Sequence, residues 1–184
     1  MERKRCRWAD PASELYIAYH DEEWGKPEHD DRKLFEMLIL EGFQAGLSWI
    51  TILKKREAFR EAFDNFDPAV IAQYPPEKME QLMGDPGIVR NRRKIEAAVQ
   101  NAKVFLDIQR EYGSFDRYLW GFTGGKIILN TDNVVRASSP LSDRISADLK
   151  RRGMKFVGTV ILYSFLQAVG VVNDHETDCW CYPS

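Results

Sequence analysis

The sequence predicts an all-α protein. Apolar residues recur every three or four positions over most of the chain, as they do on one face of a helix. Proline stands near the start, and glycine just beyond the end, of several of these stretches, which is the usual asymmetry of helix boundaries. No internal repeat or low-complexity linker divides the 184 residues, so we expect a single domain over 1–184 with roughly eight to ten helices.

The expected helices follow one another closely. Helices are predicted over 31–40, 46–63 and 68–73, and a short one begins at Pro75-Pro76 and ends before Gly84. A long amphipathic helix over 90–112 ends at Gly113, and others are expected over 115–122, 142–152 and 156–169. The segment 123–137 is the least helical, because Gly124-Gly125 and the β-prone run 127–129 indicate a loop or a short strand.

Composition and charge narrow the class of protein. The net charge is −2, and no apolar run approaches the ~18 residues that a transmembrane helix needs, so we expect no membrane segment. The basic start of the chain is not followed by the apolar stretch of a secretory signal. Three cysteines, an odd number, favour a reducing compartment over a disulfide framework, and we expect a cytoplasmic protein.

A possible metal site combines the two ends of the chain. Cys6 and His20 lie near the N-terminus, whereas His175 and Cys179 are four residues apart near the C-terminus. Two cysteines and two histidines are the ligand set of a closed tetrahedral zinc site. Cys181 is an alternative to Cys179, and the simpler interpretation is a set of ordinary terminal thiols.

The stretch 41–50 combines a carboxylate, small residues and an indole. Glu41 opens it, Gly42, Ala45 and Gly46 leave the backbone accessible, and Trp49 stands near its end. This combination suits a flat, electron-poor ring, although a helix–turn–helix with a solvated Glu41 explains it too. Further aromatic residues accumulate near the N-terminus, and stacking walls for a flipped base need such side chains: Trp8, Tyr16, Tyr19 and Trp24.

A third candidate site lies at 84–95. The Gly-containing turn is expected to expose backbone N–H groups beside the N-terminus of the following helix, which favours an anion. Arginine and lysine oppose the helix dipole there, and a bound phosphate would resolve that conflict. The segment is similar to a helix-hairpin-helix DNA-binding motif, with Arg90 near the place of its usual second glycine. The alternative is that this basic cluster, like those near 3–7, 54–56 and 150–155, is a solvated helix end.

Several sequence blocks in one order resemble the 3-methyladenine DNA glycosylase I family, the constitutive alkyladenine repair enzymes of the helix-hairpin-helix superfamily. The resemblance runs from Cys6-Arg7-Trp8 to Cys181-Tyr182-Pro183. The matching blocks are 16–25, 33–37, 41–51, 87–90, 155–159 and 172–175.

The resemblance implies a glycosylase fold with its helix-hairpin-helix near 77–100 and a zinc-binding lobe made of 1–25 and 170–184. It implies one structural Zn²⁺ on Cys6, His20, His175 and Cys179, although the extra thiol of Cys181 departs from a simple ligand pattern. Glu41 takes the position of the catalytic-site carboxylate that faces the lesion base. The base pocket is expected to comprise Trp8, Tyr16, Tyr19, Trp24, Trp49 and Ser164. DNA contacts are expected from Gln44, Leu47, Gly87, Arg90, Arg92 and Lys94, with Gln44 and Leu47 inserted into the duplex.

The implied activity is base-excision repair by a monomeric, monofunctional glycosylase that flips out 3-methyladenine from alkylated double-stranded DNA and leaves an abasic site. Aromatic faces attract the cationic methylated ring by ~0.5–2 kcal/mol each, and we expect Glu41 to act mainly in base recognition. No lysine stands out as a Schiff-base nucleophile. Two other classes remain as alternatives: a zinc-stapled lesion sensor without chemistry, and a structural helical protein without DNA affinity.

Overall fold

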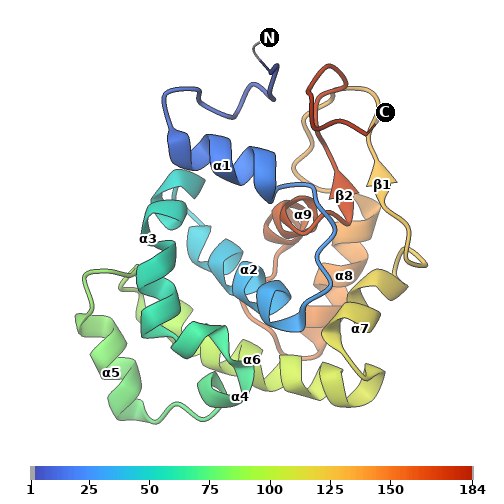
Figure 1. The fold of residues 1–184 in the computed structure, drawn as a ribbon. Coiled ribbons are helices and arrows are strands. Elements are labelled where there is room, and N and C mark those ends of the chain that lie inside the picture. The colour runs from blue at the N-terminus through green and yellow to red at the C-terminus, as the bar shows by residue number, and fades with distance from the viewer. Residues whose placement is uncertain (1–2, 184) are drawn as a thin grey trace.

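The computed structural model describes residues 3–183 and is predominantly helical, as the sequence predicts (Figure 1). Its helices are α1 (Glu14–Glu22), α2 (Asp31–Gln44), α3 (Trp49–Ala62), α4 (Pro68–Ile71), α5 (Pro76–Gly84), α6 (Arg92–Tyr112), α7 (Phe115–Gly121), α8 (Pro140–Arg151) and α9 (Thr159–Ala168), with a 3₁₀ turn at Asp64–Phe66. Strands β1 (Ile128–Leu129) and β2 (Val172–Asn173) form a short parallel pair. None of the helices between residues 3 and 183 combines the length and apolarity that a bilayer crossing requires.

Helix α2 lies at the centre of the fold. Asp30 caps its start by accepting a hydrogen bond from the backbone N–H of Lys33, and every residue from Leu34 to Phe43 is buried. The helix packs against α3, α6, α7 and α9, so that apolar neighbours surround it on all sides. A helix enclosed in this way holds any polar residue it carries in a fixed place, and α2 carries Glu36 and Glu41.

Three helix starts fall later than the periodicity predicts, each for a local reason. The helix expected from Gly46 begins at Trp49, since Gly46 has a φ of +81° and lies in a turn. Asn91 caps α6 through its side chain, which places Arg90 outside the helix. Phe156 has a φ of +54°, so α9 begins only at Thr159.

Helix α1 was not expected from the sequence. Its apolar pattern is weak, because only Tyr19 and His20 are buried within it. The hydroxyl of Ser13 starts the helix by accepting a hydrogen bond from the backbone N–H of Tyr16. The helix therefore serves mainly to present Tyr16, Tyr19 and His20 to their neighbours.

The two ends of the described chain meet at one end of the molecule (Figure 1). The backbone N–H of Trp180 donates to the carbonyl of Lys4 over 2.9 Å, and Arg7 Nε lies 2.9 Å from Glu176 Oε1. The strand pair β1–β2 joins the segment after α7 to the segment after α9. The residues expected to form a terminal metal site are thereby brought onto one side of α2.

Candidate active site and metal centre

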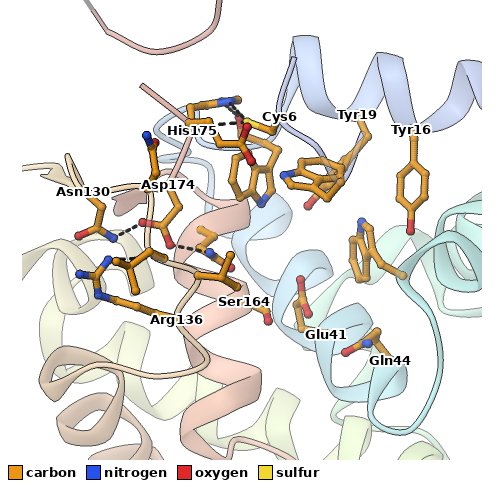
Figure 2. Close-up of a pocket in the computed structure, with 18 residues that line it drawn as sticks. Cys6, Tyr16, Tyr19, Glu41, Gln44, Asn130, Arg136, Ser164, Asp174 and His175 are labelled. Carbon is orange, nitrogen blue, oxygen red and sulfur yellow. Dashed lines mark hydrogen bonds between the residues drawn. The ribbon is translucent and has the colours of Figure 1, made fainter. Parts of the chain in front are cut away.

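A pocket of about 340 Å³ opens between α1, the end of α2, the start of α3, α9 and the segment 130–136 (Figure 2). All of the predicted base-binding residues line it, together with Glu41 and Gln44. Its remaining lining comes from positions to which the sequence analysis gave no role in base binding. The full lining is Cys6, Trp8, Tyr16, Tyr19, Trp24, Glu41, Gln44, Trp49, Asn130, Asn133, Val134, Val135, Arg136, Ser164, Gln167, Asp174, His175 and Glu176.

One wall of the pocket is aromatic. Trp8 stands edge-on to Trp24 and Tyr16, with ring centroids 5.0 and 5.7 Å away. Tyr19 and Trp49 form a second tilted pair at 5.6 Å. The Tyr16 hydroxyl accepts a hydrogen bond from the backbone N–H of Ile50 over 3.2 Å, which ties α1 to the start of α3. The rings are thus held in fixed orientations, as a stacking site for a planar ligand requires.

Glu41 places a buried carboxyl group in this pocket. It lies in the last turn of α2, and its side chain is directed toward the aromatic wall (Figure 2). The residue is only 4% exposed, and no cation within residues 3–183 forms an ion pair with it. Burial raises the pKa of Glu41 to about 8, because the charged form is poorly solvated. A cationic ligand in the pocket would supply the missing counter-charge.

A tight turn joins Glu41 to Trp49. The side-chain amide of Gln44 donates to the carbonyl of Leu47 over 2.6 Å, and the N–H of Leu47 donates to the carbonyl of Gln44 over 2.7 Å. Leu47 lies at the tip of the turn with 38% of its surface exposed. The buried indole N–H of Trp49 has no hydrogen-bond partner within the described part of the chain, a feature that often marks functional sites.

The opposite wall is polar, and the sequence analysis missed it. Asp174 accepts hydrogen bonds from the hydroxyl of Tyr163 and the side-chain amide of Gln167, both over 2.6 Å, and from the side-chain amide of Asn130. Asp174 thereby anchors the segment 130–136 to α9. Ser164 also lines this side, as predicted. The only signal for Asp174 was its place in a block shared with the family, since Asn130 lies 44 residues away in sequence.

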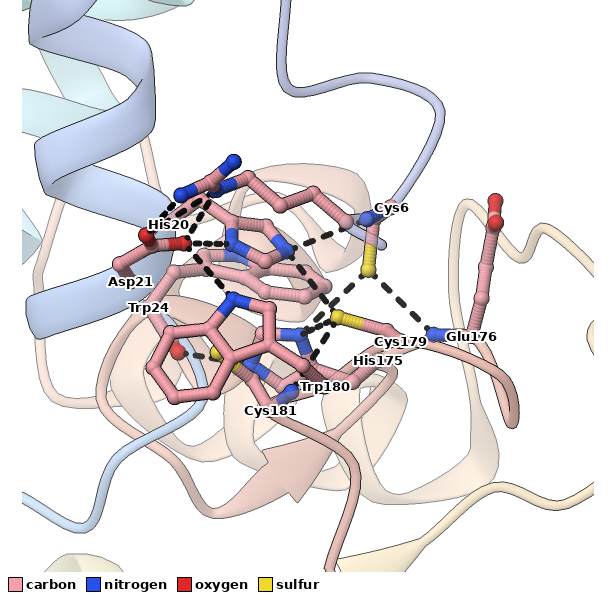
Figure 3. Close-up of polar contacts among 10 residues, drawn as sticks. Cys6, His20, Asp21, Trp24, His175, Glu176, Cys179, Trp180 and Cys181 are labelled. Atoms are coloured by element: carbon pink, nitrogen blue, oxygen red, sulfur yellow. Dashed lines mark hydrogen bonds and ion pairs between the residues drawn. The ribbon is translucent and has the colours of Figure 1, made fainter. Parts of the chain in front are cut away.

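The four predicted metal ligands come together in a buried cluster (Figure 3). The ligand atoms of Cys6, His20, His175 and Cys179 all lie within 4.8 Å of one another. Cys6 Sγ is 3.4 Å from His175 Nδ1, and Cys179 Sγ is 3.4 Å from His20 Nε2. Cys181 is only half-buried and stands outside this set, although it forms a second group with His20 and Asp21. The cluster could hold a metal ion.

The surroundings of the cluster orient both histidine rings. His20 Nδ1 lies 2.8 Å from Asp21 Oδ1, and His175 Nε2 lies 3.1 Å from the carbonyl of Trp24. Each ring therefore donates an N–H outward and leaves its other nitrogen facing the cluster, the usual arrangement around metal-binding histidines. The backbone N–H of Glu176 lies 3.3 Å from Cys6 Sγ and would stabilise a thiolate there.

The predicted DNA-contacting residues have different environments. Gly87 lies in the turn between α5 and α6, and Arg90 is exposed and forms no ion pair within residues 3–183. Arg92 pairs with Glu80 through two contacts of 2.7 and 2.9 Å. The sequence placed Lys94 among the phosphate contacts, whereas the structure buries it: its Nζ donates to the carbonyls of Phe43 and Ala45. An ammonium engaged inside the protein does not face a phosphate.

Comparison with known proteins gives one consistent answer. Residues 8–182 match the methyladenine glycosylase family. The chain is 49% identical to DNA-3-methyladenine glycosylase 1 of Escherichia coli K12, over 98% of this chain and 97% of that protein. It is 45% identical to DNA-3-methyladenine glycosylase of Haemophilus influenzae, over 98% of each.

Solved structures agree. A crystal structure of a 3-methyladenine DNA glycosylase I superposes with a TM-score of 0.94 at 50% identity, over 98% of this chain and 100% of that one. A 3-methyladenine DNA glycosylase I from Staphylococcus aureus, whose structure concerns 3-methyladenine recognition, has a TM-score of 0.93 at 39% identity, over 98% and 97% of the two chains. Fold and sequence together define a glycosylase, an enzyme that hydrolyses N-glycosyl bonds. The chain belongs to the methyladenine glycosylase family.

Proposed function

We propose that this enzyme removes 3-methyladenine from alkylated double-stranded DNA by hydrolysing the N-glycosidic bond, as the first step of base-excision repair. One observation carries the proposal: a buried carboxyl without a counter-ion, Glu41, faces a wall of fixed aromatic rings. That arrangement favours a flat cationic base over a neutral one, and methylation at N3 makes adenine cationic. The names of the relatives point to the same substrate.

The pocket favours the methylated base in two ways. Each aromatic face attracts a cationic ring by ~0.5–2 kcal/mol. Glu41 is protonated or nearly so in the empty pocket at neutral pH, given its pKa of about 8, and a cationic base would draw it into the ionised form. A charge-assisted hydrogen bond from the base to that carboxylate is worth about 1.5–3 kcal/mol. Glu41 acts mainly in recognition, and any help to the attacking water is secondary.

The chemistry needs little further assistance. Water adds to C1′ of the flipped nucleotide as the C1′–N9 bond breaks. The bonding electrons leave with the methylated base, and the proton lost by the attacking water passes to solvent. The base departs neutral, so the leaving group requires no acid. The product is an abasic site, and the enzyme is monofunctional. Borohydride reduction during turnover should trap no covalent adduct with the DNA.

The duplex binds across the turn between α5 and α6, which acts as a helix-hairpin-helix. The DNA backbone is contacted by Gly87 and Arg90, and by Arg92 once that side chain exchanges Glu80 for a phosphate. The gap left by the flipped base is filled by Gln44 and Leu47. The exposed apolar tip at Leu47 supports this role. Flipping costs a few kcal/mol, which stacking in the pocket and the inserted side chains offset. Replacing Arg90 with Gln should lower the salt dependence of DNA binding by about one phosphate contact.

The Cys/His cluster fits one structural zinc ion. With Zn–S near 2.3 Å and Zn–N near 2.0–2.1 Å, a tetrahedral ion sets sulfur and nitrogen ligands about 3.6 Å apart. Three of the four sulfur–nitrogen distances in the cluster are 3.4, 3.4 and 3.6 Å. The ion would be held by Cys6, His20, His175 and Cys179. It would cross-link the two terminal segments without taking part in hydrolysis.

We infer a cytoplasmic monomer that acts on DNA.

The deciding experiment is release of free base from DNA treated with a methylating agent, resolved by chromatography, with Glu41→Gln measured alongside. Release of 3-methyladenine by the wild type, with a large loss in the variant, supports the proposal. DNA binding without base release would favour a lesion sensor instead. If Glu41→Gln binds the free base normally yet releases none from DNA, Glu41 acts in the chemical step and the recognition role is wrong.

A further inference from the structure

The side chain of Lys94 closes the end of a neighbouring helix. Lys94 lies in the first turn of α6 and is 9% exposed. Its Nζ donates to the carbonyl of Phe43 over 2.8 Å and to that of Ala45 over 2.7 Å. Helix α2 ends at Gln44, and the last carbonyls of a helix have no donor within it. A cation is also favoured there by the helix dipole.

The helix end that Lys94 holds carries the pocket. Glu41 lies two residues before Phe43, and Gln44 stands between the two carbonyls that accept from Lys94. The turn then passes the exposed Leu47 and reaches Trp49, which belongs to the aromatic wall of the pocket. A shift of the carbonyls at 43 and 45 would therefore move the recognition carboxyl and the apolar tip together.

A second lysine makes the reverse connection. Lys55 lies on α3, and its Nζ donates to the carbonyls of Pro86 and Gly87 over 3.0 and 3.3 Å. Helix α3 thus holds the turn between α5 and α6, while α6 holds the end of α2. Two lysines therefore connect the α5–α6 turn, which is proposed to contact DNA, with the helices that carry the base pocket.

Lys94 has no carboxylate partner within residues 3–183, so its charge is compensated only by carbonyl dipoles. Burial lowers the pKa of Lys94 for this reason. A buried ammonium without a counter-ion contributes little net stability compared with an apolar side chain of similar size. Its presence is explained better by the geometry it fixes than by the free energy of folding.

We propose that Lys94 is a positioning residue that couples DNA contact at the α5–α6 turn to the placement of Glu41 and Leu47. This inference rests on the proposed function. Lys94 touches neither substrate nor reacting atoms, and acts through the carbonyls of Phe43 and Ala45.

The test compares Lys94→Met with Asn101→Ala. Asn101 is a matched control, because it is also a buried polar residue of α6 that bonds two backbone groups of another segment, the carbonyl and the N–H of Lys155, both over 2.8 Å. Neither bond reaches the pocket. The measurements are single-turnover excision from a duplex with one 3-methyladenine, affinity for an abasic duplex, and thermal unfolding. A 2-aminopurine next to the lesion reports extrusion of the base.

We expect Lys94→Met to slow excision at least tenfold and to reduce the 2-aminopurine signal, with affinity for the abasic duplex within about threefold of wild type. Asn101→Ala, which breaks two buried hydrogen bonds, should lose more thermal stability than Lys94→Met but keep excision within twofold. Lys94→Gln, which retains amide donors, should be intermediate and replaces the Met variant if that one does not fold. Equal excision by the Lys94 and Asn101 variants overturns the inference. If the wild type itself releases no base, the proposed function fails instead.

Discussion

Glu36 and Glu41 lie on the same buried helix, five residues apart, and among residues 3–183 only Glu36 has cationic partners. Its Oε1 is 2.6 Å from Arg56 Nε and 2.8 Å from the Arg60 guanidinium, whereas Glu41 faces the pocket without a counter-ion. The fold therefore neutralises one carboxylate of α2 and leaves the other for a ligand. The contrast supports the proposed role of Glu41 more directly than its burial does.

Replacing Glu41 with Gln should stabilise the protein at alkaline pH. The pKa of Glu41 in the folded protein, about 8, exceeds the ordinary value of 4.5. The stability that this group contributes is therefore fully present below about pH 4.5 and is lost as the pH rises through 8, by an amount on the order of 5 kcal/mol at most. Glu41→Gln removes this loss. Urea unfolding at pH 5, 7 and 9 measures it, and parallel pH profiles for the two proteins would contradict the assignment.

Removal of one terminal thiol should distinguish the two candidate zinc ligands. Cys179→Ser is expected to lose the metal and to lower the unfolding temperature strongly, since Cys179 Sγ lies against both His20 Nε2 and His175 Nδ1. Cys181→Ser should retain one zinc ion per chain. Elemental analysis of the purified variants, together with thermal unfolding, decides between them. Loss of metal from the Cys181 variant alone would assign the site to the other thiol.

Asp174→Asn should loosen the polar wall of the pocket. Asp174 accepts from Tyr163 and Gln167 at one oxygen and from Asn130 at the other. Asparagine keeps only one acceptor oxygen and so cannot serve all three donors, and an unsatisfied buried partner costs about 1–3 kcal/mol. We expect faster amide exchange over 130–136 and slower excision.

Asp107→Asn is the control for that experiment, because Asp107 pairs with Arg110 at the surface of another helix, where ion pairs contribute about 0–1 kcal/mol. Equal rates of amide exchange over 130–136 in the two variants would contradict the anchoring role of Asp174.

Gly87→Ala should weaken DNA binding without affecting free-base binding. A methyl group at Gly87 would lie 2.9 Å from the Cβ of Ala58 and 3.0 Å from Asp85 Oδ1, so the turn has to shift away from α3. Gly84→Ala is the matched control, since nothing lies within 4 Å of a methyl group there and alanine favours the helix. Duplex affinity and 3-methyladenine affinity, measured by fluorescence titration, test the pair. A normal duplex affinity for Gly87→Ala would count against the hairpin as a DNA contact.

Helices that bury an apolar stripe were predictable from the sequence, because the period of the stripe survives in the folded structure. The long helix ends at Tyr112 as expected, with Gly113 at a φ of +87°. Helix α1 was missed because Leu15 is exposed and the buried residues are Tyr19 and His20. Such a helix is held by the pocket and the cluster rather than by a core stripe.

The aromatic and metal-ligand sets were predictable because their residue types are chemically distinctive. The polar wall was not, since Asn130 and Asp174 meet only through the β1–β2 pairing, which involves two residues of each strand. Lys94 shows a different limit: a lysine in a basic cluster looks solvated in sequence, and only the packing of α6 against α2 turns it inward.

The cluster that joins the two ends of the chain is made of residues that the ribosome adds at very different times. Cys6 and His175 are 169 residues apart, so at about 5–20 residues per second a ribosome makes the second ligand roughly ten to thirty seconds after the first. During that interval the N-terminal segment lacks its contacts with the C-terminal one, such as the hydrogen bond from the N–H of Trp180 to the carbonyl of Lys4. The pocket therefore stays incomplete until the segment that carries Asp174 and His175 is made, because both residues belong to its lining.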